Sequence, residues 1–260
     1  MMTLKNSNYF SPEAQRTYWS VSQFKAFNNC EAEGLAETVG EYQREETDAL
    51  LIGSYVDAYF AGEIDEFIKR DGDKMHQKNG KLYAKFEGAN NIIDRIESDS
   101  LMMDYLKGEK QVIKTANLFG VDWKIKIDVL TDERIVDLKI VKDFGSVYKD
   151  GFGYRPWIEA WGYDIQGAIY QKVEQISSGR DEPLPFYIVA ATKEKVTDID
   201  VIQIPQHILD AALKVVESKI DRFDLIKIGE LSPNRCGVCN YCKETKVLTE
   251  PSIYEIVEAE

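Results

Sequence analysis

Two runs in which apolar and polar residues alternate, 123–130 and 135–141, lie on either side of the polar segment 131–134. A period of two is typical of β-strands, because successive side chains of a strand point to opposite faces. A connection of two or four residues is short enough to join neighbouring antiparallel strands. The pattern therefore predicts a β-hairpin near the middle of the chain.

Both loop lengths centre the turn on the same bond, and this fixes which residues face each other across the hairpin. Asp128 is expected opposite Asp137, and Lys126 opposite Lys139. Facing carboxylates repel one another across a ladder, and a divalent cation with oxygen ligands would compensate for that repulsion. The alternative is an ordinary solvated face of an antiparallel sheet, on which acids and lysines are common.

The rest of the chain switches between helical and extended patterns, which indicates an α/β domain. Ser20 and Gln23 resemble a capping box at the start of the first helix. Trp157 and Trp161 lie four residues apart on a later helix, so we expect both in the core rather than free to stack on bases. The expected helices span about 20–36, 47–61, 89–107, 157–176 and 206–228, and the further strands span 111–119, 185–191 and 198–204.

At 260 residues and 44% hydrophobic content, the chain can form one substantial core, and we expect residues 1–260 to be a single domain. The net charge of −13 argues against unspecific binding to nucleic acid, because lysine and arginine make the phosphate contacts. The stretch 107–149 differs, since it holds nine Lys and Arg against seven Asp and Glu. A DNA enzyme that touches its substrate only in a groove would show this distribution, and so would a protein that never meets DNA.

Asp128 followed by Asp137-Leu138-Lys139 matches the D…(D/E)-x-K signature of the PD-(D/E)XK nucleases, and the chain resembles this superfamily. Gln166 and Tyr170 resemble the Gln-x-x-x-Tyr motif of its RecB-like branch, and residues four apart lie on one face of a helix. The resemblance extends from residue 20 to residue 242. It implies a restriction-endonuclease-like α/β fold, with a mixed central sheet flanked by helices and a core of about residues 47–228.

The resemblance also implies the activity of a magnesium- or manganese-dependent deoxyribonuclease. Gly53-Ser-Tyr-Val-Asp57 sits where phage exonucleases of the λ and RecE type carry Gly-x-x-x-His, with Asp57 at the histidine position. Lys139 would position and polarise the attacking water or stabilise the transition state. Gln166 and Tyr170 would orient the DNA backbone or the catalytic lysine. The implied magnesium ligands are Asp57, Asp128, Asp137 and the backbone carbonyl of Leu138.

Cys236, Cys239 and Cys242 form a C-x2-C-x2-C cluster, and the fourth cysteine, Cys30, is far away in the sequence. Thiolates suit iron-sulfur clusters or zinc. One cysteine before the core and three after it resembles RecB-like nucleases of the AddB kind and those of CRISPR spacer acquisition, which bind a 4Fe-4S cluster. We therefore prefer a 4Fe-4S cluster that joins the N-terminal helix (20–36) to the C-terminal loop (232–246), with Zn²⁺ as the alternative. Disulfides, or a site made by three of the cysteines with Cys30 simply buried, are the other interpretations.

No apolar signal segment opens the chain and no run is long enough for a membrane span, so we expect a cytoplasmic protein with reduced thiols. The leading hypothesis is a DNA exonuclease that resects DNA ends in phage-type homologous recombination. Its partners would be DNA, a single-strand annealing protein and, in a homo-oligomer, further copies of the chain. The alternatives are a CRISPR- or helicase-associated processing nuclease, and a non-catalytic iron-sulfur or zinc protein that uses the nuclease fold to bind DNA or a partner.

Overall fold

The computed structural model describes residues 3–149 and 153–251. Its centre is a five-stranded sheet in the order β1-β2-β3-β6-β7. The sheet is mixed, as expected, because β3 and β6 are parallel while the other neighbours are antiparallel. Its strands are β1 (Glu109–Leu118), β2 (Val121–Leu130), β3 (Ile135–Val141), β6 (Phe186–Thr192) and β7 (Ile199–Gln203), and a separate pair comprises β4 (Val147–Lys149) and β5 (Gly153–Arg155).

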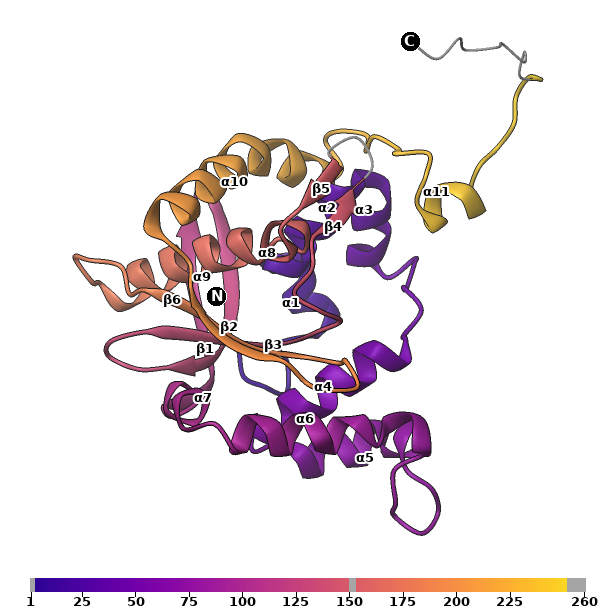
Figure 1. The fold of residues 1–260 in the computed structure, drawn as a ribbon. Helices are drawn as coiled ribbons and strands as arrows, with labels where there is room; N and C mark the ends of the chain where they lie inside the picture. The colour runs from indigo at the N-terminus through magenta and orange to yellow at the C-terminus, as the bar shows by residue number, and fades with distance from the viewer. Residues whose placement is uncertain (1–2, 150–152, 252–260) are drawn as a thin grey trace.

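Helices cover both faces of this sheet (Figure 1). On one face α2, α9 and α10 bury apolar residues of the sheet such as Ile125, Ile127 and Ile188. On the other face α4, α6 and α7 bury Val136 and Val189. The helices are α1 (Pro12–Thr17), α2 (Val21–Asn29), α3 (Glu31–Val39), α4 (Asp48–Ala61), α5 (Ile64–Met75), α6 (Gly88–Glu97), α7 (Ser100–Tyr105), α8 (Trp157–Ala160), α9 (Tyr163–Ser178), α10 (Gln206–Lys227) and α11 (Asn240–Glu244), with a 3-10 turn at Ala84–Phe86.

The hairpin forms with a four-residue loop and the expected register, since Leu130 pairs with Ile135 and Val129 with Val136. The β2–β3 ladder stops after these two pairs. Asp128 and Asp137 are the next residues in this register, at the point where the strands separate. The expectation that Lys126 faces Lys139 across a continuous ladder is wrong, because no pairing extends that far along the hairpin.

Residues from the N-terminal segment occupy the space beside β2 that β3 leaves. The Trp19 N–H donates to the Asp122 carbonyl, and the Lys124 N–H donates to the Trp19 carbonyl, both at 2.8 Å. The Trp19 side chain is 1% exposed and packs between Phe27 and Trp123. The sheet is therefore completed on this side by a chain segment that precedes α2, and the backbone of β2 is not left unpaired in the interior.

Three expected helices are divided in the structure. The segment 20–36 forms α2 and α3, which meet at Cys30, although the capping box at Ser20 is present. The segment 89–107 is interrupted by Asp99, whose carboxylate caps α7 by accepting from the N–H groups of Leu101 and Met102. The segment 157–176 is interrupted at Gly162, which has a φ of 63°. Burial of Trp161 was expected from a continuous helix, and that expectation is wrong: Trp161 is 48% exposed, whereas Trp157 is buried.

None of the helices in the described part of the chain combines the length and the hydropathy needed to cross a membrane.

Candidate active site

Asp128 stands at the fork between β2 and β3. Its Oδ2 accepts the Leu138 N–H at 2.9 Å, so a side chain takes the place of a ladder carbonyl. Its Oδ1 lies 3.4 Å from Nε2 of Gln111, which has a φ of 54° in β1. The carbonyl of a strand residue points toward the same neighbour as its N–H, so the carbonyl of Leu138 also faces the fork.

Asp137 and Lys139 are two residues apart on β3, so their side chains share one face of the strand, the face that α9 covers. Asp137 is 1% exposed, and its Oδ1 accepts a hydrogen bond of 2.7 Å from Gln166 Nε2. Its Oδ2 forms an ion pair of 2.6 Å with Lys139 Nζ. Burial raises the pKa of Asp137 to about 7, although the Lys139 charge opposes the shift.

Lys139 is held as a cation by the acids around it. Burial alone would lower the pKa of this lysine, but the charges of Asp137 and Asp128 outweigh burial and raise the pKa above its ordinary value. Its Nζ also lies 3.4 Å from the Leu138 carbonyl and 5.4 Å from the centroid of the Tyr163 ring. Lys139 is therefore a proton and hydrogen-bond donor rather than a free base in this arrangement.

Asp57 reaches the same place from α4. It lines a cleft of about 260 Å³ together with Asp128, Leu138, Lys139 and Lys193. Burial and the nearby charge of Asp128 raise the pKa of Asp57 to about 7. The site thus gathers three carboxylates, of Asp57, Asp128 and Asp137, and the backbone carbonyl of Leu138. Hard divalent cations such as Mg²⁺ take oxygen ligands of this kind, so the donor set fits the metal that the family resemblance implied.

Gln166 and Tyr170 both come from α9 but contact different parts of the site. Gln166 bonds to the Asp137 carboxylate, as described above. The Tyr170 hydroxyl donates to the Lys126 carbonyl at 3.0 Å, in the part of β2 that β3 does not pair. The two residues therefore contact the two sides of the fork, Gln166 at β3 and Tyr170 at β2, and neither of these hydrogen bonds involves Lys139.

Lys25 and Tyr163 are residues of this site that the sequence did not reveal. Lys25 extends from α2, and its Nζ lies 5.1 Å from the centroid of the Tyr163 ring, the ring that Lys139 also approaches. Burial, and then the charge of Lys139, lower the pKa of Lys25 to about 8. The helical pattern of α2 marked its core residues, but it carried no signal for where the polar face would lie.

The four cysteines come together at a second site, behind the end of α2. The Sγ atoms of all four lie within 4.8 Å of one another. Cys30 lies at the junction of α2 and α3, and its Sγ is 3.6 Å from that of Cys242 in α11. The Cys239 N–H and the Cys242 N–H point at the sulfurs of Cys236 and Cys239, at 3.3 and 3.4 Å. Four converging thiols are a donor set for a metal ion or an iron-sulfur cluster.

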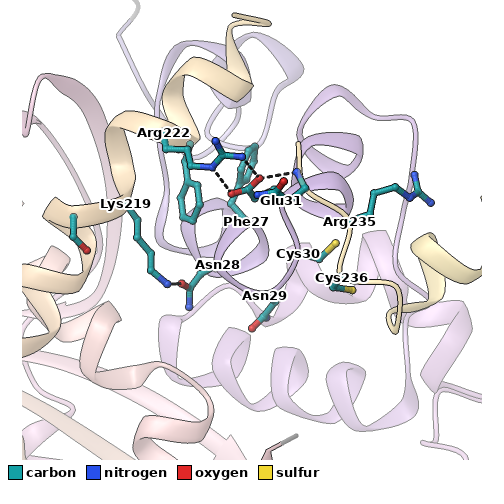
Figure 2. A pocket seen from close by; sticks show the side chains of 12 residues that line it. Phe27, Asn28, Asn29, Cys30, Glu31, Lys219, Arg222, Arg235 and Cys236 are labelled. Atoms are coloured by element: carbon teal, nitrogen blue, oxygen red, sulfur yellow. Dashed lines mark hydrogen bonds and ion pairs between the residues drawn. The ribbon is translucent and has the colours of Figure 1, made fainter. Parts of the chain in front are cut away.

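A pocket of about 320 Å³ adjoins this site, and Cys30 and Cys236 form one of its walls (Figure 2). At this pocket, Glu31 connects α10 to the loop that precedes Cys236. Its two carboxylate oxygens accept from Nε and Nη2 of Arg222 at 2.8 and 2.9 Å, and Oε2 also accepts the Asn234 N–H at 2.7 Å (Figure 2). The charged pair therefore ties α10 and the loop before Cys236 to the first turn of α3.

Comparisons with known proteins agree with this geometry. A crystal structure at 2.19 Å described as a "putative exonuclease" from Eubacterium rectale is 40% identical, with 97% of each chain covered and a TM-score of 0.91. Another solved structure, of SSO0001, is 16% identical over 85% of this chain and 93% of the other, with a TM-score of 0.26, too low to indicate a shared fold. A search of curated proteins finds no match. Residues 20–245 match a family described as a PDDEXK-like domain of unknown function (DUF3799), and the chain belongs to this family of the PD-(D/E)XK nuclease superfamily.

Proposed function

We propose that the protein is a magnesium-dependent deoxyribonuclease that acts as an exonuclease on DNA ends. The observation that supports this best is the fork of the central hairpin, where Asp128 and Lys139 line a cleft and Lys139 forms an ion pair with the buried Asp137. The relative described as an exonuclease supports the same activity.

Asp57, Asp128, Asp137 and the Leu138 carbonyl would hold a divalent metal ion, which would supply Lewis-acid chemistry by making water more acidic and offsetting negative charge on the phosphate. The Gln166 amide fixes the Asp137 carboxylate through Oδ1 and leaves Oδ2 directed at Lys139. The Lys139 ammonium would donate hydrogen bonds to the water or to the phosphate oxygens as charge develops there. Tyr170 holds the Lys126 carbonyl and so keeps β2 at its distance from β3.

The four-cysteine site would be structural in this proposal, with a 4Fe-4S cluster preferred over Zn²⁺. It would tie α2 and α3 to the C-terminal loop and thereby keep Lys25 near the catalytic cleft. Iron, sulfide and zinc content, together with the visible absorption of the protein, distinguish the two metals. Zinc without iron would rule out the cluster and leave the nuclease proposal intact.

The biological setting that we propose is end resection in phage-type recombination, with a single-strand annealing protein as partner and a homo-oligomer as the working form. Co-purification with the annealing protein of the same genome and light scattering test these two statements separately. A preference for short single-stranded or overhang substrates would instead favour a CRISPR- or helicase-associated processing nuclease.

The activity itself is tested with linear duplex DNA and Mg²⁺. We expect Asp137→Asn and Lys139→Met to abolish degradation, because each removes one charge from the fork. Lys142→Met is the matched control, since Lys142 follows three residues later on the same segment, and its side chain is 92% exposed. A wild-type protein that retards DNA on a gel but leaves it intact would overturn the proposal in favour of the non-catalytic DNA-binding protein.

A further inference from the structure

β1 contains a backbone conformation that its place in the sheet does not require. Among residues 3–149 and 153–251, two residues other than glycine have a positive φ, Gln111 at 54° and Phe119 at 55°. Phe119 and Gly120 form the two-residue turn between β1 and β2, where positive φ values are usual. Gln111 lies inside β1, where a left-handed conformation is costly for a residue with a side chain.

The pairing of β1 with β2 gives no reason for the conformation of Gln111. Lys110 pairs with Val129 and Val112 pairs with Ile127, so a single residue separates the two pairs on each strand. A β-bulge, which is a common cause of irregular strand backbone, needs an extra residue on one of the strands. The conformation of Gln111 therefore does not correct the register of the sheet.

The two strands change faces at Gln111. Ile127 packs on the side of the sheet that α9 and α10 cover, whereas Val129 packs on the side that α4 and α6 cover. In a regular strand, residues two apart share one face. Val112 packs on the same side as its partner Ile127, and Lys110 lies with its partner Val129 on the side of α4.

This change of face brings two neighbouring residues of β1 to the candidate active site. Lys110 and Gln111 both line a small cavity of about 10 Å³, and Asp57, Asp128 and Leu138 line the same cavity. Neighbouring residues of a regular strand point to opposite faces, so they would not both reach one cavity. The left-handed conformation therefore places a polar side chain beside two of the proposed metal ligands.

The Gln111 side chain faces one particular oxygen of Asp128. Asp128 Oδ2 accepts the Leu138 N–H at 2.9 Å, while Oδ1 lies 3.4 Å from Gln111 Nε2. Gln111 is only 9% exposed, so its amide has little freedom to turn away. An amide donor orients a carboxylate without cancelling the negative charge that attracts a divalent cation, and carboxylates that bind metals are usually held by such partners.

We propose that Gln111 is a positioning residue of the nuclease site, and that the left-handed conformation in β1 brings its amide to Oδ1 of Asp128. The inference rests on the proposed nuclease function and deepens it, because it names a residue that orients a metal ligand without binding the metal itself. Strain of this kind persists where it serves a site. Partners that orient metal ligands typically contribute about tenfold to 100-fold to metal affinity.

The test measures Mn²⁺ binding to the full chain without DNA, from the EPR signal of free Mn²⁺. Asp128→Asn identifies the binding that belongs to this site. Gln111→Met removes the amide and keeps a side chain of similar length, whereas Gln111→Gly removes the whole side chain and tolerates a positive φ. We expect both Gln111 variants to bind Mn²⁺ about tenfold or more weakly than the wild type. Gln203→Met is the matched control, since Gln203 is an exposed glutamine on β7, the opposite edge strand of the sheet.

Urea denaturation of the same variants separates positioning from folding. Gln111→Met keeps the strained backbone and most of the packing, whereas Gln111→Gly relieves the strain and loses the packing, so the two variants should differ in stability. A positioning role predicts the same loss of Mn²⁺ affinity in both, because both lack the amide. With DNA present, the Mg²⁺ concentration for half-maximal activity should rise in both variants, while KM for DNA at saturating Mg²⁺ stays unchanged.

Normal Mn²⁺ affinity in either Gln111 variant would overturn the inference, and so would a loss of affinity that follows stability instead of the missing amide. The two proposals fail separately. A wild type that cuts DNA while the Gln111 variants bind Mn²⁺ normally contradicts only the inference. A wild type that binds Mn²⁺ through Asp128 and Gln111 but cuts no DNA contradicts only the nuclease activity, and a wild type without Asp128-dependent Mn²⁺ binding would overturn both.

Discussion

Gly167 lies next to Gln166 on α9, where the helix packs against Phe186 of β6. A Cβ at this position would lie 2.6 Å from Cδ1 of Phe186 and 2.9 Å from Cδ2 of Leu209. Both neighbours are buried, with 0% and 1% exposure, so neither can swing away into solvent. Normal carbon–carbon contacts are about 3.5–4.0 Å, and Gly167→Ala would therefore force α9 and β6 apart by roughly 1 Å.

The stability effect is a difference between two terms. Overpacking of a filled core typically costs about 1–3 kcal/mol, while replacing a helical glycine by alanine contributes about 1 kcal/mol in the opposite direction. We expect Gly167→Ala to lower the free energy of unfolding by up to about 2 kcal/mol, measured by urea denaturation. Because Gln166 moves with the helix, its 2.7 Å bond to Asp137 should weaken, and kcat should fall further than the small loss of folded protein explains.

The comparison for this variant is Gly53→Ala, a second helical glycine, at which a Cβ would meet nothing within 4 Å. Gly53→Ala should raise the free energy of unfolding by about 0.5–1 kcal/mol, since it gains helix propensity without a steric cost. If Gly167→Ala proved as stable as Gly53→Ala, the close packing of α9 on β6 would be refuted, and with it the account of how Gln166 is positioned.

Three further predictions concern charges and metal. Lys124 is 1% exposed, and burial lowers its pKa to about 8. Between about pH 8 and pH 10.5 this lysine is protonated in the unfolded chain and neutral in the folded chain. The free energy of unfolding should therefore rise with pH over this window. Urea titrations of Lys124→Met should show a smaller rise, and an equal rise in both proteins would contradict the assignment. Glu31→Gln should weaken the hydrogen bonds to Arg222 and Asn234 by about 1–2 kcal/mol. The cysteine site should then lose metal to a chelator faster, as measured by absorption or with a zinc dye. An unchanged rate of metal loss would show that these bonds do not hold the cysteine loop. Removal of the bound metal should lower Tm in the wild type but not in Cys242→Ser, because the thiol site is tied to folding, and a Tm unaffected by chelation would contradict a structural role.

The hairpin and its register could be predicted because they depend on local rules. A four-residue loop between alternating runs leaves one pairing in which both apolar faces are buried, and Val129 does face Val136. The end of the ladder after two pairs could not be predicted, because it depends on Tyr170 and Trp19, which supply partners to backbone groups of β2 from outside the hairpin. Those partners are distant in sequence and meet only when the helices pack.

Trp161 shows where a periodic pattern misleads. Its spacing from Trp157 fits a buried helical stripe, yet Gly162 adopts a left-handed conformation and ends α8 just beyond Trp161, which turns that ring to solvent. Glycine inside a helical pattern is the signal that could have revealed this break. Lys25 and Cys30, which both come from the first expected helix, differ in whether the sequence could place them. The family resemblance placed Cys30 with the other cysteines, whereas the position of Lys25 depends on how α2 packs beside α9.

The insertion of Trp19 beside β2 has a consequence for any shortened version of the protein. A chain that begins at Ser20 would keep every residue of the catalytic signature and of the thiol site. It would nevertheless leave the Asp122 carbonyl and the Lys124 N–H without their hydrogen-bond partner, the backbone of Trp19. It would also leave a cavity in place of the Trp19 side chain, which is 1% exposed. Trp19 thus pairs with the free edge of β2 from the amino end, and trimming the chain past it for crystallisation or expression would remove this pairing.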